Sequence, residues 1–223
     1  MEKSFRKSSL SNSGYIICLT IIIITISLFA WLALHIKDGG TVVADERVFE
    51  WAFALRGEYF TGFMRFMTFL GSSFFLLPAN LGFVFLLFYF KKDKLMGIQW
   101  IITSLIALLL MYIFKGIYQR PRPLDPFLKA ASGFSFPSGH TLNGLVFFGL
   151  VMLFLWRFCQ NNLLKISGTI VLGMIILMIG FSRIYLRVHY ASDVLGGLAL
   201  GTAWLTSSLI IFDYWRRKSL PIA

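Results

Sequence analysis

Long apolar runs separated by short polar segments dominate this sequence. Six runs reach about 20 residues, the length that a helix needs to cross a hydrocarbon core of roughly 30 Å. They fall near residues 14–36, 72–90, 97–115, 141–158, 166–182 and 194–212. The pattern predicts an all-α, polytopic membrane protein in which six transmembrane helices form a bundle.

Residues 45–70, between the first two runs, follow a different pattern. Apolar residues recur there at steps of three and four, and the charged residues fall outside that stripe, as on an amphipathic helix. The stripe comprises Val48, Ala52, Leu55, Tyr59, Phe63, Phe66 and Leu70. We expect this segment to lie in the membrane interface with a break at Gly57. It is either a rim that admits a lipid substrate sideways or a plain connector.

The composition supports the membrane class. Hydrophobic residues make up 57% of the chain and charged residues 14%, and the mean hydropathy is +0.76, which excludes an ordinary soluble domain. The first run is too long for the apolar core of a cleaved signal peptide, so we expect a retained helix. Residues 1–223 contain no repeat or long linker and are predicted to form a single transmembrane domain. Pro78 is expected to kink the second span, and Cys18 and Cys159 to be core residues.

The formal net charge of +11 suggests a nucleic-acid partner until its distribution is considered. Many basic residues occupy every second segment between the spans, so that with six spans they all fall on one side, as the positive-inside rule expects of the cytoplasmic face. These residues are Lys3, Arg6, Lys7, Lys91, Lys92, Lys94, Arg157, Lys165, Arg216, Arg217 and Lys218. We therefore predict a multi-pass protein of the plasma membrane with both termini in the cytoplasm and no nucleic-acid partner.

Three polar clusters interrupt the apolar pattern, and all three map to the outer ends of helices by this topology. They are Lys115 followed by Arg120-Pro121-Arg122-Pro123, then Pro137-Ser138-Gly139-His140, and finally Ser182-Arg183 with His189 and Asp193. Outer loops are poor in Lys and Arg unless those residues have a task. Their presence is the first indication of function.

Residues from all three clusters suit the binding of a phosphoryl group, whose charge is spread over three equatorial oxygens. Lys115, Arg122 and Arg183 supply permanent positive charge, and an arginine fork matches two phosphate oxygens at once. Proline suits the first turn of a helix, and the backbone amides exposed there form an anion site. The Ser138 hydroxyl and the Gly139 amide are therefore expected to point at the phosphate.

The third cluster supplies a nucleophile. His189 and Asp193 are four residues apart and share a face if the sixth helix begins before the histidine. The carboxylate then accepts the Nδ1 hydrogen and leaves the Nε2 lone pair free to attack phosphorus. His140 is placed to donate a proton to the leaving oxygen and later to take one from water. His189 is thus the predicted nucleophile, Asp193 its orienter and His140 the acid and base.

Each residue also has a structural interpretation. A histidine at a helix end is often only a structural residue. Lys115 or Arg187, taken alone, can be interpreted as a residue whose long side chain extends its charge to the membrane interface. Arg120 and Lys129 can be interpreted as charged residues on a solvent-exposed surface. His35, at the outer end of the first span, has no patterned partner and is interpreted as an interfacial residue.

With these residues in place, the sequence resembles the type 2 phosphatidic acid phosphatase superfamily of membrane lipid phosphatases, and within it the bacterial phosphatidylglycerophosphatase B-like members. The signature motifs of that family are Lys, six residues, Arg-Pro; Pro-Ser-Gly-His; and Ser-Arg, five residues, His, three residues, Asp. All of them match without substitution, as Lys115 with Arg122-Pro123, Pro137 to His140, and Ser182-Arg183 with His189 and Asp193. Arg120 also precedes a proline, but only Arg122 has the motif spacing, so replacing Arg120 is predicted to be the milder change.

The resemblance implies a site at the outer surface of a six-helix bundle, a phosphohistidine at His189, acid and base work by His140, and no metal or other cofactor. It assigns phosphate binding to Lys115, Arg122, Ser138, Gly139 and Arg183.

The expected partner is a lipid phosphate drawn from the bilayer. Substrates in similar bacterial proteins include phosphatidylglycerophosphate, phosphatidic acid, diacylglycerol pyrophosphate and undecaprenyl pyrophosphate, and the motifs do not choose among them. The alternatives are a phosphotransferase that uses the same histidine, a non-catalytic anion transporter, and haloperoxidase chemistry. Transport sites usually lie near the membrane midplane, whereas these charges lie at helix ends. The sequence carries no feature that sets an oligomeric state.

Overall fold

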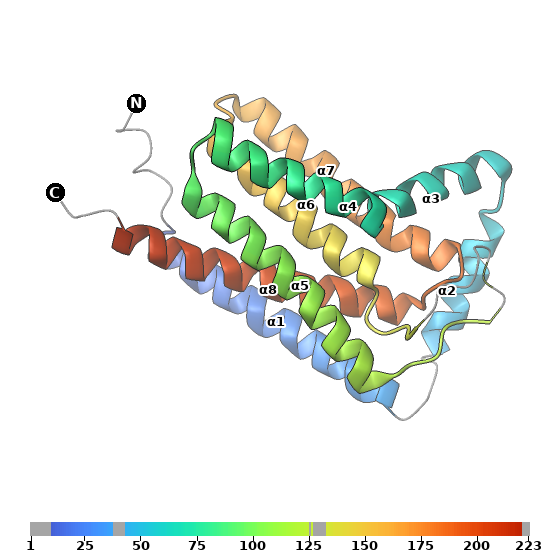
Figure 1. Ribbon diagram of the computed structural model, residues 1–223. Helices are drawn as coiled ribbons and strands as arrows, with labels where there is room; N and C mark the ends of the chain where they lie inside the picture. The colour runs from blue at the N-terminus through green and yellow to red at the C-terminus, as the bar shows by residue number, and fades with distance from the viewer. Residues whose placement is uncertain (1–9, 38–42, 125, 127–132, 220–223) are drawn as a thin grey trace.

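The computed structural model describes residues 10–37, 43–124, 126 and 133–219. Its regular structure in these ranges is helical (Figure 1). The elements are α1 (Asn12–Lys37), α2 (Val43–Ala54), α3 (Glu58–Leu70), α4 (Ser73–Phe85), the π-helical turn η2 (Leu86–Phe90), α5 (Lys94–Tyr118), α6 (Gly139–Phe158), α7 (Asn162–Tyr185) and α8 (Ala191–Ser219).

Six helical segments in the described ranges are long and apolar enough to cross a membrane, which confirms the predicted spans. They cover Asn12–Ile36, Ser73–Phe90, Lys94–Tyr118, Gly139–Phe158, Asn162–Tyr185 and Ala191–Lys218. Polar caps explain why two of them begin before their apolar run. The Asp93 carboxylate accepts the Met96 N–H at 3.0 Å, and the Asn161 side chain caps α7 in the same way. Pro78 lies inside α4.

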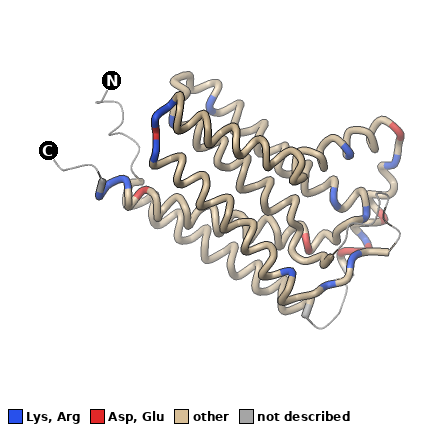
Figure 2. The backbone as a smooth tube through the Cα atoms, in the orientation of Figure 1, with Lys and Arg blue, Asp and Glu red and all other residues tan. Residues whose placement is uncertain are grey.

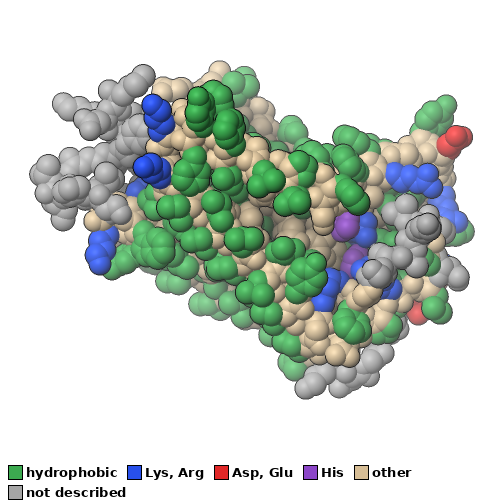
Figure 3. All heavy atoms as spheres, in the orientation of Figure 1, with side chains coloured by type: hydrophobic (Ala, Val, Ile, Leu, Met, Phe, Trp, Pro, Cys, Tyr) green, Lys and Arg blue, Asp and Glu red, His purple; other side chains and the backbone are tan. Residues whose placement is uncertain are grey.

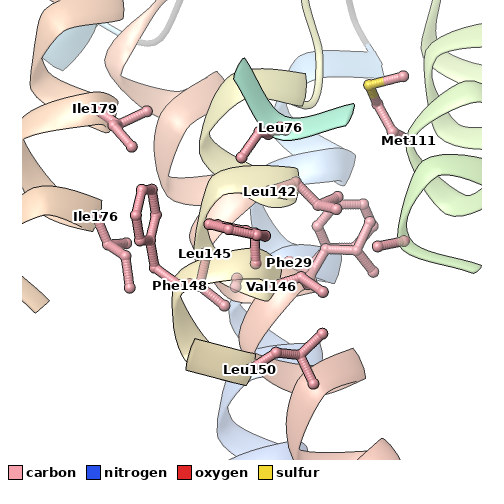
Figure 4. Packing of buried hydrophobic residues seen from close by; sticks show 14 of the residues in the cluster. Phe29, Leu76, Met111, Leu142, Leu145, Val146, Phe148, Leu150, Ile176 and Ile179 are labelled. Carbon is pink, nitrogen blue, oxygen red and sulfur yellow. The ribbon is translucent and has the colours of Figure 1, made fainter. Parts of the chain in front are cut away.

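Helix α6 forms the centre of the bundle and packs against α5, α7 and α8, while α1 packs along α8. Figure 4 shows Leu142, Val146 and Phe148 of α6 between Phe29 on one side and Ile176 of α7 on the other. All five side chains are buried in one apolar cluster. Burial of this apolar surface fixes the direction of α6 and therefore the position of its first residues.

Two glycines let α8 approach α6 closely. A Cβ at Gly197 would lie 2.8 Å from the Ser138 carbonyl oxygen, and one at Gly201 would lie 3.3 Å from the Leu142 carbonyl oxygen. Small residues four positions apart allow such close contact between membrane helices. The Ser138 N–H consequently reaches the Asp193 carbonyl oxygen at 3.0 Å, so the start of α6 and the start of α8 are joined.

The amphipathic segment between the first two spans forms two helices, and the predicted break lies at Gly57, the residue before α3. On α3 the stripe residues Tyr59, Phe63 and Phe66 are exposed, and a different face, which carries Met64, Met67 and Thr68, is buried in the protein. This face packs on α7 and brings Thr68 toward the site described below.

The two ends of the bundle differ in their residues. The Tyr15 hydroxyl donates to the Asp213 carboxylate at 2.7 Å, so the start of α1 and the end of α8 lie at the same end. Figure 2 shows the Lys and Arg residues gathered toward both ends of the long helices, with few charges between them. The predicted site residues lie at the end away from Tyr15 and Asp213 (Figures 1 and 2).

Candidate active site

A cavity of about 1070 Å³ extends from the loop end of the bundle along α4 and α5. Figure 3 shows histidine and cationic atoms side by side in a hollow on this face of the molecule. Six of the eight predicted site residues line the cavity: Lys115, Arg122, Gly139, His140, Arg183 and His189. Residues from three polar clusters far apart in the sequence are therefore brought to one place.

The other two predicted residues, Ser138 and Asp193, are completely buried outside the lining of the cavity. The Ser138 hydroxyl accepts a hydrogen bond from the Thr141 hydroxyl at 2.9 Å. The Ser138 hydroxyl is therefore not exposed to the cavity, although the next two residues, Gly139 and His140, line it. Asp193 lies in the first turn of α8, directly behind His189.

His189 lies in the turn between α7 and α8, because α8 begins only at Ala191. The condition that the sixth spanning helix begins before the histidine is therefore not met. The turn is held by the Arg183 carbonyl oxygen, which accepts the N–H groups of Val188 at 3.1 Å and His189 at 3.2 Å. Arg187 adopts a left-handed φ of 52° in this turn. The turn places Arg183 and His189 on the same cavity.

The two ring nitrogens of His189 have different partners. Arg122 Nη1 lies 3.1 Å from Nε2, and because a guanidinium only donates, Nε2 must be the acceptor. The proton of the neutral ring is therefore on Nδ1, which lies 3.2 Å from the Ser135 hydroxyl and 3.4 Å from the Asp193 carboxylate. The Ser135 hydroxyl in turn donates to Asp193. The predicted contact between His189 and Asp193 exists but is long, and Ser135 shares it.

Burial keeps this imidazole neutral. Burial, together with smaller effects of the Arg183 and Arg122 charges, lowers the pKa of His189 from its ordinary value to about 3, although the contact with Asp193 opposes this shift. At neutral pH the ring therefore carries no charge. A neutral imidazole with its proton on Nδ1 presents an Nε2 lone pair, which is the form that attacks an electrophile.

Arg120 is the residue that the sequence interpretation missed. A solvated face was one expectation, and it is wrong, because the side chain is only 5% exposed. Its guanidinium donates from Nη1 to Asp193 at 2.7 Å and from Nη2 to Asp45 of α2 at 3.0 Å. Its position before a proline, two residues ahead of Arg122, was a signal, but Asp45 lies 75 residues away along the chain. Ser135 lacked even such a signal.

The cations on the cavity are held by neutral oxygens. Lys115 Nζ donates to the carbonyl oxygens of Phe134 and Ser135, and Arg183 Nη1 donates to the Thr68 hydroxyl. The Nε of Arg183 is buried and finds no hydrogen-bond partner among the described residues. Buried donors are nearly always satisfied, so this group marks a place for an acceptor.

Arg122 completes this set of cations. Besides approaching His189, its Nε donates to the Gly133 carbonyl oxygen at 3.0 Å, and its Nη1 donates to the Val188 carbonyl oxygen at 2.8 Å. These contacts hold the guanidinium beside Nε2 of His189. An oxyanion in the cavity would therefore meet a charged fork next to Nε2.

Gly139 and His140 also line the cavity. Gly139 is the first residue of α6, and a Cβ there would overlap the Met111 sulfur unless that side chain moved. Pro137 lies two residues before α6 rather than in its first turn, which corrects the expected helix start. His140 follows Gly139, is half-buried, and lines the same cavity as His189.

Two other expectations concern residues away from the cavity. His35 is exposed at the end of α1, where its ring lies against Trp31, and it is not among the cavity-lining residues. Cys18 is buried and Cys159 half-buried, and both are free thiols. Lys129 lies outside the described residues, as do Lys3, Arg6 and Lys7 of the predicted cytoplasmic clusters. Across the described part of the chain, no three His, Cys, Asp or Glu side chains gather in a metal-binding group.

These features define a class: a helical, multi-pass membrane protein with a cationic cavity that carries two histidines at one end of the bundle. The PAP2 superfamily model matches residues 96–217. Phosphatidylglycerophosphatase B of Bacillus subtilis is 33% identical over 176 residues, which cover 78% of this chain and 85% of that protein. The chain therefore belongs to the PAP2 superfamily and is a membrane-embedded enzyme of this lipid phosphatase family.

Other relatives agree with this assignment. Undecaprenyl-diphosphatase of Sulfolobus acidocaldarius is 29% identical over 159 residues, covering 65% of this chain and 66% of that protein. The crystal structure of a transmembrane PAP2-type phosphatidylglycerolphosphate phosphatase from Bacillus subtilis superimposes with a TM-score of 0.72 at 29% identity, covering 89% of this chain and 98% of that one. LpxE of Aquifex aeolicus shares the fold, with a TM-score of 0.60 at 23% identity over 76% of this chain and 96% of its own.

Proposed function

We propose that this enzyme removes the terminal phosphate from a lipid phosphomonoester or pyrophosphate through a phosphohistidine at His189. The observation that carries the proposal is the state of His189. Its neutral ring has the proton on Nδ1, and its Nε2 lies on a cavity that Lys115, Arg183 and His140 also line. His189 is thus prepared to attack, and the cations Lys115, Arg122 and Arg183 line the cavity where the phosphate would bind.

In the first half-reaction, the phosphate oxygens accept hydrogen bonds from Lys115, Arg122 and Arg183. Arg122 then turns its Nη1 from Nε2 of His189 to the phosphate, which releases the lone pair. Nε2 attacks phosphorus, the bond from phosphorus to the leaving oxygen breaks, and the electron pair stays on that oxygen. The protonated ring of His140 donates its proton to the leaving oxygen. Asp193 stabilises the positive ring of the phosphohistidine.

In the second half-reaction, water attacks the phosphorus of the phosphohistidine. His140, now neutral, takes one proton from that water. The bond between phosphorus and Nε2 breaks, and the electron pair returns to Nε2. Inorganic phosphate leaves, and both histidines regain their starting protonation states.

The shape of the cavity supports a lipid substrate. Leu77 and Leu81 of α4 and Leu105 of α5 line it and are also exposed on the outside of the bundle, so the cavity opens toward the bilayer. Trp100 lines its deep end, fifteen residues before Lys115 on α5, which is about 22 Å at the rise of an α-helix. An acyl or prenyl chain can lie along this length with its phosphate at Lys115. The names of the relatives include both phosphatidylglycerophosphate and undecaprenyl diphosphate, and we propose the same broad range here.

We further propose that the site faces the outside of the cell. Arg157, paired with Asp93, and Arg217, beside Tyr15, lie at the end of the bundle where α1 starts and α8 ends. The positive-inside rule expects the cytoplasm at this end. Single-cysteine variants of a chain with both native cysteines replaced by alanine test this orientation. Leu124→Cys should react with a membrane-impermeant maleimide in intact cells, and Lys218→Cys should react only after lysis. The reverse pattern would contradict the orientation.

Phosphate release by the purified protein tests the function. The substrates are phosphatidylglycerophosphate, phosphatidic acid, diacylglycerol pyrophosphate and undecaprenyl pyrophosphate in detergent micelles with EDTA, and the His189→Ala protein is the blank. We expect release of inorganic phosphate from at least one of them without an added acceptor. Loss of phosphate from the lipid only when an alcohol acceptor is supplied, with the phosphoryl group recovered on the alcohol, would indicate a phosphotransferase. Loss of activity in EDTA and its recovery with magnesium would contradict catalysis by the Lys and Arg side chains alone.

A further inference from the structure

A buried network of charges lies behind His189 and includes a residue of the interfacial helix α2. The guanidinium of Arg120 lies between two carboxylates, 3.0 Å from Asp45 and 2.7 Å from Asp193. The three side chains are at most 5% exposed. Two carboxylates with a single cation carry one net negative charge, and an unbalanced buried charge persists only where another group compensates it.

Asp45 is held rigidly in this network. Its Oδ1 accepts the Ser192 N–H at 2.8 Å, and its Oδ2 accepts the Ser192 hydroxyl at 2.7 Å as well as Arg120. Arg120 also stacks on the ring of Tyr190 at 4.0 Å, so its plane is fixed. Asp45 is therefore tied to the residue immediately before Asp193, and α2 to the first turn of α8.

The same network reaches the histidine. The carboxylate of Asp193 accepts the Tyr190 N–H at 2.9 Å and the Ser135 hydroxyl, and it lies 3.4 Å from Nδ1 of His189. The Ser135 N–H is in turn bound by the Arg120 carbonyl oxygen at 2.8 Å. Arg120 thus positions both groups that contact Nδ1.

We propose that Asp45 is a positioning residue for the nucleophile: by sharing Arg120 with Asp193, it leaves the network behind His189 with one net negative charge. This inference rests on the proposed phosphohistidine mechanism. Without Asp45, Arg120 and Asp193 form a neutral pair that offers little stabilisation to a positive ring. With Asp45 present, the net negative charge of the three groups compensates the charge that His189 gains when it is phosphorylated.

The direct test is the nearly isosteric Asp45→Asn, with Glu46→Gln, its exposed neighbour on α2, as the matched control. Hydrolysis of a lipid phosphate that the wild-type enzyme cleaves is measured together with competitive inhibition by inorganic phosphate. We expect kcat to fall about tenfold to hundredfold, the usual cost of losing an outer partner of a catalytic group. The inhibition constant should stay within about twofold, because Lys115, Arg122 and Arg183 are untouched. Glu46→Gln should match wild type.

A charge-restoring variant separates electrostatic positioning from structural support. Arg120→Gln alone leaves two buried carboxylates, whereas Asp45→Asn combined with Arg120→Gln returns the net charge to one negative. We expect the double variant to turn over faster than either single variant. A purely structural role predicts that the double variant is the slowest. If Asp45→Asn does not fold in detergent, the test is whether the double variant turns over faster than Arg120→Gln.

Three results would overturn the inference. They are an unchanged kcat in Asp45→Asn, an equal loss of kcat and phosphate affinity, and a double variant slower than both single variants. Absence of phosphate release by the wild-type protein would instead count against the proposed function, so the two failures are distinguishable.

Discussion

The two sides of His189 carry cations with different kinds of partners. On the rear side, Arg120 is buried between the carboxylates of Asp45 and Asp193. On the cavity side, Lys115 and Arg183 donate to carbonyl or hydroxyl oxygens, and no carboxylate of the described residues pairs with them. The rear charges are paired within the protein and leave one net negative charge behind His189, while the charge on the cavity side is complementary to a phosphate. The contrast separates the orientation of the nucleophile from the binding of the substrate.

Replacing the rear carboxylate nearest to the histidine should have the largest effect. Asp193→Asn removes the charge and disturbs the acceptor that keeps the proton on Nδ1. We expect kcat to fall on the order of 10⁴-fold, as when a triad carboxylate is replaced by its amide. The melting temperature in detergent checks that the protein is folded, and a folded variant with kcat within tenfold of wild type would refute the role.

Removing a cation on the cavity side should cost less and should leave the fold intact. Arg183→Ala is expected to lower kcat/KM on the order of a hundredfold or more, the usual scale for losing a charge-stabilising donor. Arg183→Lys should recover only part of the loss, because a lysine cannot provide a fork. A loss below about fivefold for Arg183→Ala would mean that this cation does not contact the phosphate.

Removing the rear cation should act on stability as well as on turnover. Arg120→Ala leaves Asp45 and Asp193 buried without their shared partner, and breaking a buried pair costs about 3–5 kcal/mol. The structure therefore replaces the expectation that Arg120→Ala is the milder change. Thermal unfolding of Arg120→Ala and Arg183→Ala under the same conditions gives the comparison, and equal melting temperatures would show that the two sides do not differ.

The spans and the cavity residues could be predicted from the sequence because their signals are local. An apolar run of about 20 residues has few alternatives to a membrane helix. Lys115, Arg183 and His189 interrupt that pattern at helix ends, and cations and imidazoles at the outer end of a membrane bundle indicate a functional site. Gly139 also carries a local signal, since it follows Pro137 and Ser138 and begins α6.

The rear side could not be predicted because its partners are distant in sequence. Asp45 lies in the first turn of an amphipathic helix, where an acidic residue is ordinary. Ser135 and Thr68 are common polar residues whose role exists only after α3 and the loop before α6 are placed. Local patterns locate the ends of helices, and tertiary packing decides what meets there.

The smallest expected effect is on the pH dependence of the free energy of unfolding. The pKa of His189 is about 3 in the folded protein because of burial, and it has its ordinary value near 6.5 in the unfolded chain. Between pH 7 and pH 5 the unfolded state therefore gains a proton that the folded state does not. We expect a loss of about 2 kcal/mol of stability over this interval. His189→Asn should show a correspondingly smaller loss when melting is followed at both pH values, and an equal loss would contradict a buried neutral ring.

Trapping the covalent intermediate tests the central claim most directly. Purified enzyme is mixed with lipid substrate labelled with ³²P in the terminal phosphate, quenched in base within milliseconds, and digested for peptide mapping. A phosphohistidine is stable in base and labile in acid, so we expect acid-labile label on the peptide that contains His189, and none in a folded His189→Ala protein. Label on another residue, or near-normal phosphate release by His189→Ala, would contradict the assignment of His189 as the nucleophile.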